Sequence, residues 1–588
     1  MHGFYGRILE IDLTGRIFRT IELEEETCRL HLGGKGLATR LLLDENPAEV
    51  DPLSPENRII FATGPAAGTR AWGGCRYGVY TKSPLTGFYL ESYSGGRAPE
   101  ALDAAGFDAI IIKGRAESLT ALSISPDGCE FHDATELRGM HTYQAEDEAK
   151  ARFAPQGHGY GKPGALVIGP AGENLVKYAC IENDYWRSAG RGGAGTVMGS
   201  KNLKALVFAG DRKRPVHDPE GLAEYSKKFL AASKDNPGVK AYKALGTTQM
   251  VAVMNTARAF PTEYWKRGEA EHWEKLSGDT YNKTHDVTPH ACAKCLMACG
   301  RMSTIKTGRH KGLKIEGPEY ETIYAFGGLC MIEDIAEIAY LNDLCDRLGM
   351  DTISAGNLVA FAMEGAKRGK IDIDLKYGDA DAAAELIGMI AAREGLGAVM
   401  AEGIKHAAAE WGMEDLAVHV KGMEPAGYDH RGLKGMGLAY AVSDRGACHL
   451  RTTFYKPELA RIVEPDATPA ERVKVFLDFE DRLTVFDCLV LCRFYRDLYP
   501  WEELNELTRL LTGFEYSTEE LRAVGKRATD LAREFNLREG LTPEDDKLPK
   551  AFHRPLEDGR ELTRDEFEAM LSEYYLQKGW DDKGRPAG

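Results

Sequence analysis

The chain has 588 residues, a formal net charge of −16 at pH 7 and a pI near 5.5, and this acidic balance argues against a nucleic-acid-binding protein. Hydrophobic residues make up 43% and charged residues 28%, which is typical of a globular protein, and the length predicts about three or four domains. The sequence starts without a secretion-signal pattern and has no apolar run long enough to cross a membrane. We therefore expect a cytoplasmic protein whose 12 cysteines are reduced thiols or metal ligands.

Residues 1–210 are predicted to be rich in β-strands. Leu9, Ile11 and Leu13 alternate with polar residues, and Thr14-Gly15 then predicts the turn of a hairpin. Short apolar runs predict further buried strands at residues 58–63, 109–113, 165–169 and 203–208. The 64 glycines exceed the roughly 7% of average proteins, and many lie in loops of this region. We expect backbone packed closely on a bound group.

Gly190, Gly192 and Gly195 match the G-x-G-x-x-G pattern of dinucleotide-binding folds. The context argues against that interpretation, because residues 184–189 do not resemble a strand and only about eight residues separate Gly195 from the next strand. Two interpretations stay open: a tight turn inside a β domain, or backbone amides that cradle a phosphate-bearing cofactor.

From about residue 211 the pattern becomes helical. An apolar stripe at residues 341–348 is followed by Gly349, a typical helix C-cap, and residues 382–393, 469–486 and 518–535 predict further helices. The polar tail after about Asp545 is expected to wrap the surface. The predicted fold class is α+β: a β-rich cofactor-binding domain (1–210), then two mainly helical domains (211–419 and 420–588).

Cys292, Cys295 and Cys299 bring three sulfurs together, as a soft metal centre requires. Zinc sites and 4Fe-4S clusters both usually take four ligands, so a fourth must come from elsewhere. Cys492 is the preferred position over Cys488 and Cys448. A structural zinc ion bound by the same four thiols remains open at this point.

Two sets of polar residues could carry acid/base or binding chemistry. Glu316, Glu319 and Glu321 could raise one another's pKa into the range of a general acid or base, or form a solvated acidic turn. His449 is the most suggestive of the 15 histidines. The aspartates near predicted helix ends could bind a cationic ligand group or act as solvated caps; they are Asp346, Asp351 and Asp487.

Taken together, these segments resemble the tungsten-containing aldehyde ferredoxin oxidoreductase family over nearly the whole chain. The resemblance depends on the order and spacing of nine motifs: Gly33-Gly-Lys-Gly, Lys82-Ser-Pro-Leu-Thr-Gly87, Ser94-Gly-Gly, Ala189-Gly-Arg-Gly-Gly, Cys292-x2-Cys-x3-Cys299, Gly317-Pro-Glu-Tyr-Glu321, Asp346-x2-Gly-x-Asp351, Arg445-Gly-Ala-Cys-His449 and Asp487-x4-Cys492.

The resemblance implies tungsten, or less often molybdenum, held by two pterin cofactors beside a 4Fe-4S cluster, with Mg²⁺ usually bridging the pterin phosphates. The implied cluster ligands are Cys292, Cys295, Cys299 and Cys492. Arg76 would lie between cluster and pterin. The other implied cofactor contacts are Gly95, Gly96, Arg191, Gly192, Gly193, Asp346, Asp351, Asp487 and Leu491.

By the same resemblance, the expected reaction is oxidation of an aldehyde to a carboxylic acid, with Glu321 and His449 as acid/base groups and Glu319 as the alternative. Electrons would pass through the cluster to ferredoxin or an iron–sulfur subunit, and an oligomer is expected. The class II benzoyl-CoA reductase branch is the runner-up; it acts on an aromatic CoA thioester, and Cys330 would be a tungsten ligand there or else a buried apolar residue. A zinc-stabilised binding protein is the alternative outside the family.

Overall fold

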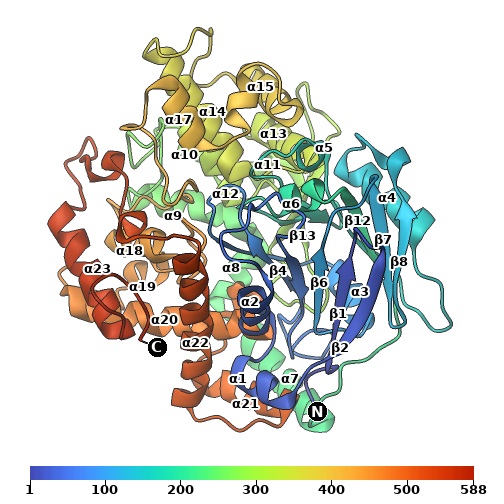
Figure 1. The fold of residues 1–588 in the computed structure, drawn as a ribbon. Coiled ribbons are helices and arrows are strands. Elements are labelled where there is room, and N and C mark those ends of the chain that lie inside the picture. The colour runs from blue at the N-terminus through green and yellow to red at the C-terminus, as the bar shows by residue number, and fades with distance from the viewer. Residues whose placement is uncertain (588) are drawn as a thin grey trace.

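The structure is a computed structural model that describes residues 1–587. Two six-stranded sheets form the N-terminal region, drawn in blue and cyan in Figure 1, and mostly helical segments follow. The first sheet has the order β2-β1-β6-β3-β4-β5, and the second has the order β11-β10-β9-β12-β7-β8. The α+β fold class is confirmed.

The strands of the first sheet are β1 (Arg7–Asp12), β2 (Ile17–Glu22), β3 (Ile59–Ala62), β4 (Tyr77–Lys82), β5 (Tyr89–Ser94) and β6 (Ala109–Lys113). Those of the second are β7 (Thr120–Ser125), β8 (Gly128–Asp133), β9 (Gly164–Val167), β10 (Ile181–Asn183), β11 (Arg187–Ala189) and β12 (Leu203–Phe208). The helices among them are α1 (Glu25–His31), α2 (Gly34–Glu45), α3 (Ala98–Ala104), α4 (Thr142–Phe153), α5 (Pro170–Glu173) and α6 (Ala194–Ser200).

The next part contains α7 (Pro219–Ser233), α8 (Pro237–Leu245), α9 (Gln249–Thr256), α10 (Trp273–Leu276), α11 (Gly278–Thr284), β13 (His285–His290), β14 (Gly300–Ile305), β15 (Lys314–Glu316), α12 (Tyr320–Thr322), α13 (Ile335–Leu348), α14 (Thr352–Lys367), α15 (Ala380–Ala392), α16 (Leu396–Met400) and α17 (Ile404–Trp411). The C-terminal part contains α18 (Lys434–Val442), α19 (Tyr455–Leu459), α20 (Pro469–Leu489), α21 (Trp501–Thr512), α22 (Thr518–Arg538) and α23 (Arg564–Lys578).

Several predicted elements are confirmed. β1 and β2 pair antiparallel with Arg7 opposite Glu22, as the hairpin pattern indicated. Gly349 ends α13 in the left-handed conformation that favours glycine. The predicted helix from residue 382 ends at Arg393, which itself takes the left-handed conformation, so its end does not need the glycines that follow.

The glycine pattern at residues 190–195 does not open a dinucleotide-binding unit. A three-residue strand, β11, does precede Gly190, which the sequence did not indicate, but β11 runs antiparallel to β10. Gly195 lies inside α6, which has only seven residues and is closely followed by β12. The expected absence of a full helix after the third glycine is confirmed.

The expectation that the tail only wraps the surface is wrong. α23 packs against α20, and it buries Phe567, Met570 and Tyr574 on one face. Tyr574 donates a hydrogen bond to the Glu480 carboxylate at 3.0 Å. The spacing of these three residues is helical, but the many charges between them hid the stripe.

Three glycines let the N-terminal region pack directly on residues 487–495 of the C-terminal part. A Cβ atom at Gly34 would lie 2.0 Å from the Asp487 carbonyl oxygen, and one at Gly64 would lie 2.5 Å from the Cys488 carbonyl oxygen. A Cβ atom at Gly73 would lie 2.9 Å from the ring of Tyr495. At these three positions the close neighbour of the glycine is protein and not a bound group.

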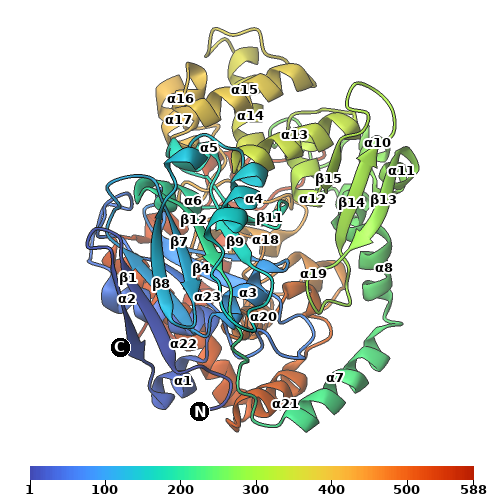
Figure 2. The same cartoon turned by 90° about the vertical axis from the view of Figure 1, so that its right-hand side faces the viewer.

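No helix within residues 1–587 is both long and apolar enough to serve as a membrane span. Figure 2 shows β13, β14 and β15 with α8 and α7 along one side of the molecule, away from the two large sheets. The cysteine segment 291–299 connects β13 to β14 on that side.

We predict that Gly34→Ala lowers the melting temperature, because the added methyl group overlaps the Asp487 carbonyl oxygen and the φ of +42° disfavours alanine. Such overpacking costs about 1–3 kcal/mol. Gly388→Ala in α15 is the matched control, since a Cβ there meets no atom within 4 Å. Equal melting temperatures for the two variants, measured by calorimetry, would contradict the prediction.

Candidate active site

A cavity of about 320 Å³ lies where the two sheets meet the helical parts. Ser92 and Tyr93 come from β5, and Glu319, Tyr320 and Glu321 come from the start of α12. The remaining lining residues are Arg76, Ser188, Gly190, Arg191, Tyr242, Thr247, Met250, Ile353, Tyr428, Arg445, His449, Leu450, Arg451, Tyr455, Arg493 and Phe494. Segments far apart in the sequence therefore share one space.

Glu321 and His449 form a pair in this cavity. Glu321 Oε1 lies 3.3 Å from His449 Nε2, and Glu321 Oε2 accepts a hydrogen bond from the Gly427 amide at 3.0 Å. Burial raises the pKa of the Glu321 carboxyl to about 8. Burial and the nearby Arg191 lower the pKa of His449 well below its usual value. Both side chains are therefore mostly uncharged at neutral pH.

The pair keeps free hydrogen-bonding capacity. Glu321 Oε1 and His449 Nδ1 are buried and have no hydrogen-bond partner in the protein. Buried polar atoms normally find a partner, so these two atoms fit the recognition of a ligand or water. Glu319 also reaches the cavity, but Thr247 donates a hydrogen bond to its carboxylate, and burial raises its pKa. Of the two glutamates, only Glu321 contacts His449.

Five arginines line the cavity: Arg76, Arg191, Arg445, Arg451 and Arg493. Only three carboxylates among the described residues pair with these arginines. Arg191 Nε lies 3.3 Å from Asp351, and Asp487 binds both Arg451 and Arg493. Glu91 pairs with Arg451 from the first sheet.

The cavity has unsatisfied donors as well as excess positive charge. Arg445 Nε, Arg451 Nε and Arg451 Nη2 are buried without a hydrogen-bond partner. Buried guanidinium groups with free donors are suited to bidentate binding of phosphate. These residues therefore fit a phosphate-bearing anionic cofactor such as a pterin.

The three predicted aspartates have different surroundings. Asp351 caps α14 by accepting from Ile353 and Ser354, and Asp487 is held by arginines, so neither is free for a cationic ligand. Asp346 lies buried within α13 and accepts from Asn342 at 2.7 Å. The structure does not bring Asp346 to the cavity lining, because it lies before the turn that leads into α14.

The glycine loops meet protein more than open cavity. Gly95 lies against Cys292, where a Cβ would be 2.9 Å from the sulfur, and the Gly96 carbonyl accepts from Ala293. Gly192 packs on Leu90, and Gly193 packs on the Lys177 carbonyl. Of the glycine-rich segment 189–193, only Gly190 and Arg191 line the cavity. Leu491 belongs to the hydrophobic core. The structure therefore does not place Gly95, Gly96, Gly192, Gly193 or Leu491 in the cavity lining.

The four predicted cluster cysteines come together beside this cavity. Burial raises the pKa of the Cys295 thiol, and the neighbouring Cys492 and Cys292 raise it further. Cys492 and Cys292 therefore lie close to Cys295. Cys299 is affected by Cys492 and Cys292 in the same way. The partly buried Arg76 lies among these sulfurs and also lines the cavity, so it connects the two.

The competing cysteines lie elsewhere. Cys488 packs against Gly36 in the core, and Cys448 accepts a hydrogen bond from Arg445 at 3.0 Å. Burial opposes ionisation of Cys448, but Arg445, Arg451 and Arg191 lower its pKa to about 6. Cys330 is buried in the helical core, and its thiol donates to the Gly356 carbonyl at 3.4 Å. A π-helical segment, Ile323–Leu329, carries Cys330 away from the cavity, so the structure does not support it as a tungsten ligand.

Within residues 1–587, no three His, Cys, Asp or Glu side chains gather closely enough to hold a single metal ion. This arrangement gives no support to a structural zinc ion, whose four ligands surround one atom. A 4Fe-4S cluster holds its thiolates farther apart, because iron and sulfide atoms lie between them. The Mg²⁺ that would bridge the pterin phosphates stays a prediction.

Sequence reasoning missed two residues beside the cysteines. Cys75 contacts Cys292. This contact and burial raise the pKa of Cys75, whereas the same contact lowers the pKa of Cys292 to about 5. The Tyr495 hydroxyl donates to Cys295 Sγ at 3.5 Å and accepts from the Leu296 amide at 2.8 Å. The only available signals were the position of Cys75 next to Arg76 and that of Tyr495 three residues after Cys492.

Two family models match the chain. "Aldehyde ferredoxin oxidoreductase, N-terminal domain" matches residues 8–210, and "Aldehyde ferredoxin oxidoreductase, domains 2 & 3" matches residues 224–588. These matches define the chain as an oxidoreductase enzyme. It belongs to the aldehyde ferredoxin oxidoreductase family, and the resemblance seen in the nine motifs is confirmed.

Individual relatives cover the full chain. The tungsten-containing aldehyde ferredoxin oxidoreductase of Pyrococcus furiosus is 36% identical over 100% of this chain and 98% of its own length. The enzyme of the same name from Thermococcus kodakarensis is 35% identical with the same coverage. The "aliphatic sulfonate oxidoreductase, WOR-like subunit" of P. furiosus is 30% identical over 100% of this chain and 96% of its own.

A solved structure is also similar. The active-site complex BamBC of benzoyl coenzyme A reductase, bound to 1,5-dienoyl-CoA, superposes with a TM-score of 0.85 at 25% identity. The similarity covers 100% of this chain and 96% of that one.

We predict that Cys492→Ser lowers the iron content and removes or converts the EPR signal of the reduced cluster, because it removes one of the four proposed ligands. Cys488→Ser is the matched control on the same segment, since its sulfur packs against Gly36. An unchanged signal in Cys492→Ser with a lost signal in Cys488→Ser would reverse the assignment.

Proposed function

We propose that this protein oxidises an aldehyde to the carboxylic acid and passes two electrons, one at a time, through a 4Fe-4S cluster to ferredoxin or an iron–sulfur subunit. The observation that carries the proposal is the Glu321–His449 pair, 3.3 Å apart in a cavity that Arg76 connects to the cysteines. The full-length similarity to tungsten-containing aldehyde ferredoxin oxidoreductases supports the substrate class.

We assign Arg76, Arg191, Arg445, Arg451 and Arg493 to holding a bispterin group through its phosphates, because their donors line the cavity. When bound, tungsten or molybdenum in that group would supply a Lewis acid that also takes up two electrons. Cys292, Cys295, Cys299 and Cys492 would hold the cluster.

The residues of the chain would handle the protons. The aldehyde and one water become the acid, two protons and two electrons. Ionised Glu321 takes a proton from the water, and the Gly427 amide holds its other oxygen in place. Neutral His449 would hydrogen-bond the aldehyde oxygen, and its ring is held by stacking on Tyr428 at 5.3 Å. Closely packed aromatic side chains would exclude bulk water.

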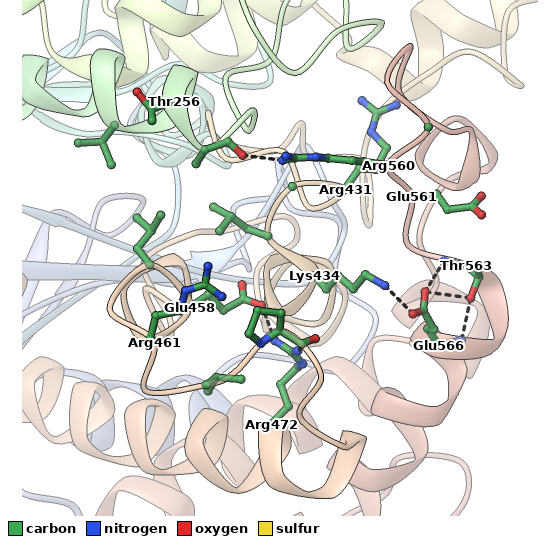
Figure 3. Close-up of a pocket in the computed structure, with 18 of the residues that line it drawn as sticks. Thr256, Arg431, Lys434, Glu458, Arg461, Arg472, Arg560, Glu561, Thr563 and Glu566 are labelled. Atoms are coloured by element: carbon green, nitrogen blue, oxygen red, sulfur yellow. Dashed lines mark hydrogen bonds and ion pairs between the residues drawn. The ribbon is translucent and has the colours of Figure 1, made fainter.

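One observation favours a second candidate, reduction of an aromatic CoA thioester. A larger groove of about 1,160 Å³ shares α9 and α19 with the cavity walls and contains five basic residues, shown in Figure 3: Arg431, Lys434, Arg461, Arg472 and Arg560. Such residues could bind CoA phosphates. Four of them already pair with acids, however, at Asp429, Glu458, Asp558 and Glu566, so the aldehyde proposal is preferred.

The deciding experiment measures anaerobic reduction of benzyl viologen by protein produced with tungstate. Aldehyde-dependent reduction, together with iron and tungsten in elemental analysis, is the expected result. Zinc without iron would overturn the redox proposal. Activity with benzoyl-CoA and a strong electron donor, but none with aldehydes, would favour the second candidate.

We predict that kcat/KM for an aldehyde rises with pH through about 8 and then levels off. Burial raises the pKa of Glu321 to about 8, so the ionised base form grows as the pH rises through that value. Glu321→Gln should remove this pH dependence and slow turnover on the order of a hundredfold or more, while tungsten stays bound. Glu319→Gln is the matched control; loss of activity there, with activity kept in Glu321→Gln, would move the role to Glu319.

A further inference from the structure

The cysteine segment 291–299 lies partly open to solvent, whereas Cys492 is buried. Cys292, Cys295 and Cys299 are all partly exposed, and the Lys294 side chain between them is 42% exposed. Electron transfer between proteins requires close approach of the two redox centres. Electrons that leave the proposed cluster would therefore reach the protein surface by the shortest path around this segment.

Three further segments frame the cysteines. Lys294 Nζ donates to the Gly68 carbonyl at 2.9 Å, and the Ala293 amide donates to the Gly96 carbonyl at 3.0 Å. At the end of α8, a Cβ at Gly246 would lie 2.5 Å from the Cys299 carbonyl oxygen. We call the exposed surface of residues 66–76, 94–100, 226–246 and 291–299 the cluster face.

α7 joins this face through hydrogen bonds and aromatic stacking. Ser226 Oγ donates to the Arg70 carbonyl at 2.8 Å, and Trp72 Nε1 donates to the Ser226 carbonyl at 2.9 Å. Phe229 of α7 stacks on Tyr495, whose hydroxyl reaches the Cys295 sulfur. The side of the molecule that carries α7, α8 and β13–β15 is visible in Figure 2.

The charge of the cluster face is opposite to that of the whole chain. Eight basic side chains are exposed there: Arg70, Arg97, Lys227, Lys228, Lys234, Lys240, Lys243 and Lys294. The same segments expose only two acidic side chains, Glu100 and Asp235, in a protein whose net charge is −16. Such a local excess attracts a partner of the opposite sign.

Most of this positive charge is not neutralised internally. Lys228, Lys240 and Lys294 contact acids, at Glu224, Asp235 and Glu100. Within the part of the chain that the structure describes, Arg70, Arg97, Lys227, Lys234 and Lys243 form no ion pair. Exposed cations without a partner cost little to bring against an acidic surface.

We propose that the cluster face docks a small acidic iron–sulfur protein, which takes up electrons there by charge complementarity. The inference rests on the proposed function and adds the location and the chemistry of the partner. Each docking event would move one electron from the reduced cluster to an oxidised carrier, so one aldehyde would reduce two carrier molecules that each accept one electron. The groove of Figure 3 is less suited to such a carrier, because the acidic side chains of Glu561 and Glu566 line it and would repel an acidic protein.

The test uses the Arg70→Glu/Lys243→Glu double variant, which reverses two free cations and leaves every cysteine and cavity residue in place. Lys474→Glu is the matched control: Lys474 is exposed on α20, thirteen residues before Asp487, or roughly 20 Å along the helix. The probes are a purified acidic ferredoxin with one 4Fe-4S cluster, and benzyl viologen, which needs no docking surface.

The expected result is a KM for ferredoxin raised about tenfold or more in the double variant at low salt, with no fall in the viologen rate. The wild-type kcat/KM for ferredoxin should fall as ionic strength rises, and this dependence should flatten in the variant. An unchanged ferredoxin KM, or an equal rise in Lys474→Glu, would overturn the docking proposal.

A direct binding measurement separates this proposal from the proposed function. Titration calorimetry of the holoprotein with the same ferredoxin should give a dissociation constant that is weaker by about tenfold or more in the double variant. If the viologen assay shows no aldehyde oxidation, the proposed function fails while this measurement still tests the docking face. Equal affinities for wild type and double variant would overturn the face.

Discussion

The buried carboxylate of Glu91 joins parts of the chain that are far apart in sequence. It lies on β5 and binds Lys35 of α2 at 3.0 Å and also Arg451, which in turn binds Asp487 at 3.0 Å. Arg451 and Lys35 lower the pKa of Glu91 although burial opposes this. Removing one member would leave a buried charge unpaired, which is strongly destabilising. The geometry of the cavity therefore depends on this network.

Much of the fold could be predicted because its signals are local. The β1–β2 hairpin, the Gly349 cap of α13 and the helices α20 and α22 follow from alternation, capping residues and apolar spacing. β11 was missed because three residues carry no period, and α23 because its charges hide a narrow apolar stripe. The boundary between residues 419 and 420 stays a prediction.

The candidate site was harder to predict than the fold because its contacts join distant segments. The structure brings Glu321 to His449, and Cys492 to the cysteine segment, as the motifs indicated. The motifs could not indicate that Gly192 and Gly193 pack on protein, or that Cys75 reaches Cys292. Cys330 does not line the cavity, and its sequence distance from Glu321 could not show the direction in which the π-helical segment runs. Side-chain direction, and not residue type, was the missing information.

The position of Cys492 has a consequence for how the protein is made. On the proposed ligand set, Cys299 leaves the ribosome 193 residues before Cys492, the last ligand. At 5–20 residues per second this gap lasts about 10–40 s. During that interval the three thiols of Cys292, Cys295 and Cys299 await the fourth ligand and are open to oxidation. Biosynthesis itself, before any turnover, would then be a step that is sensitive to oxygen.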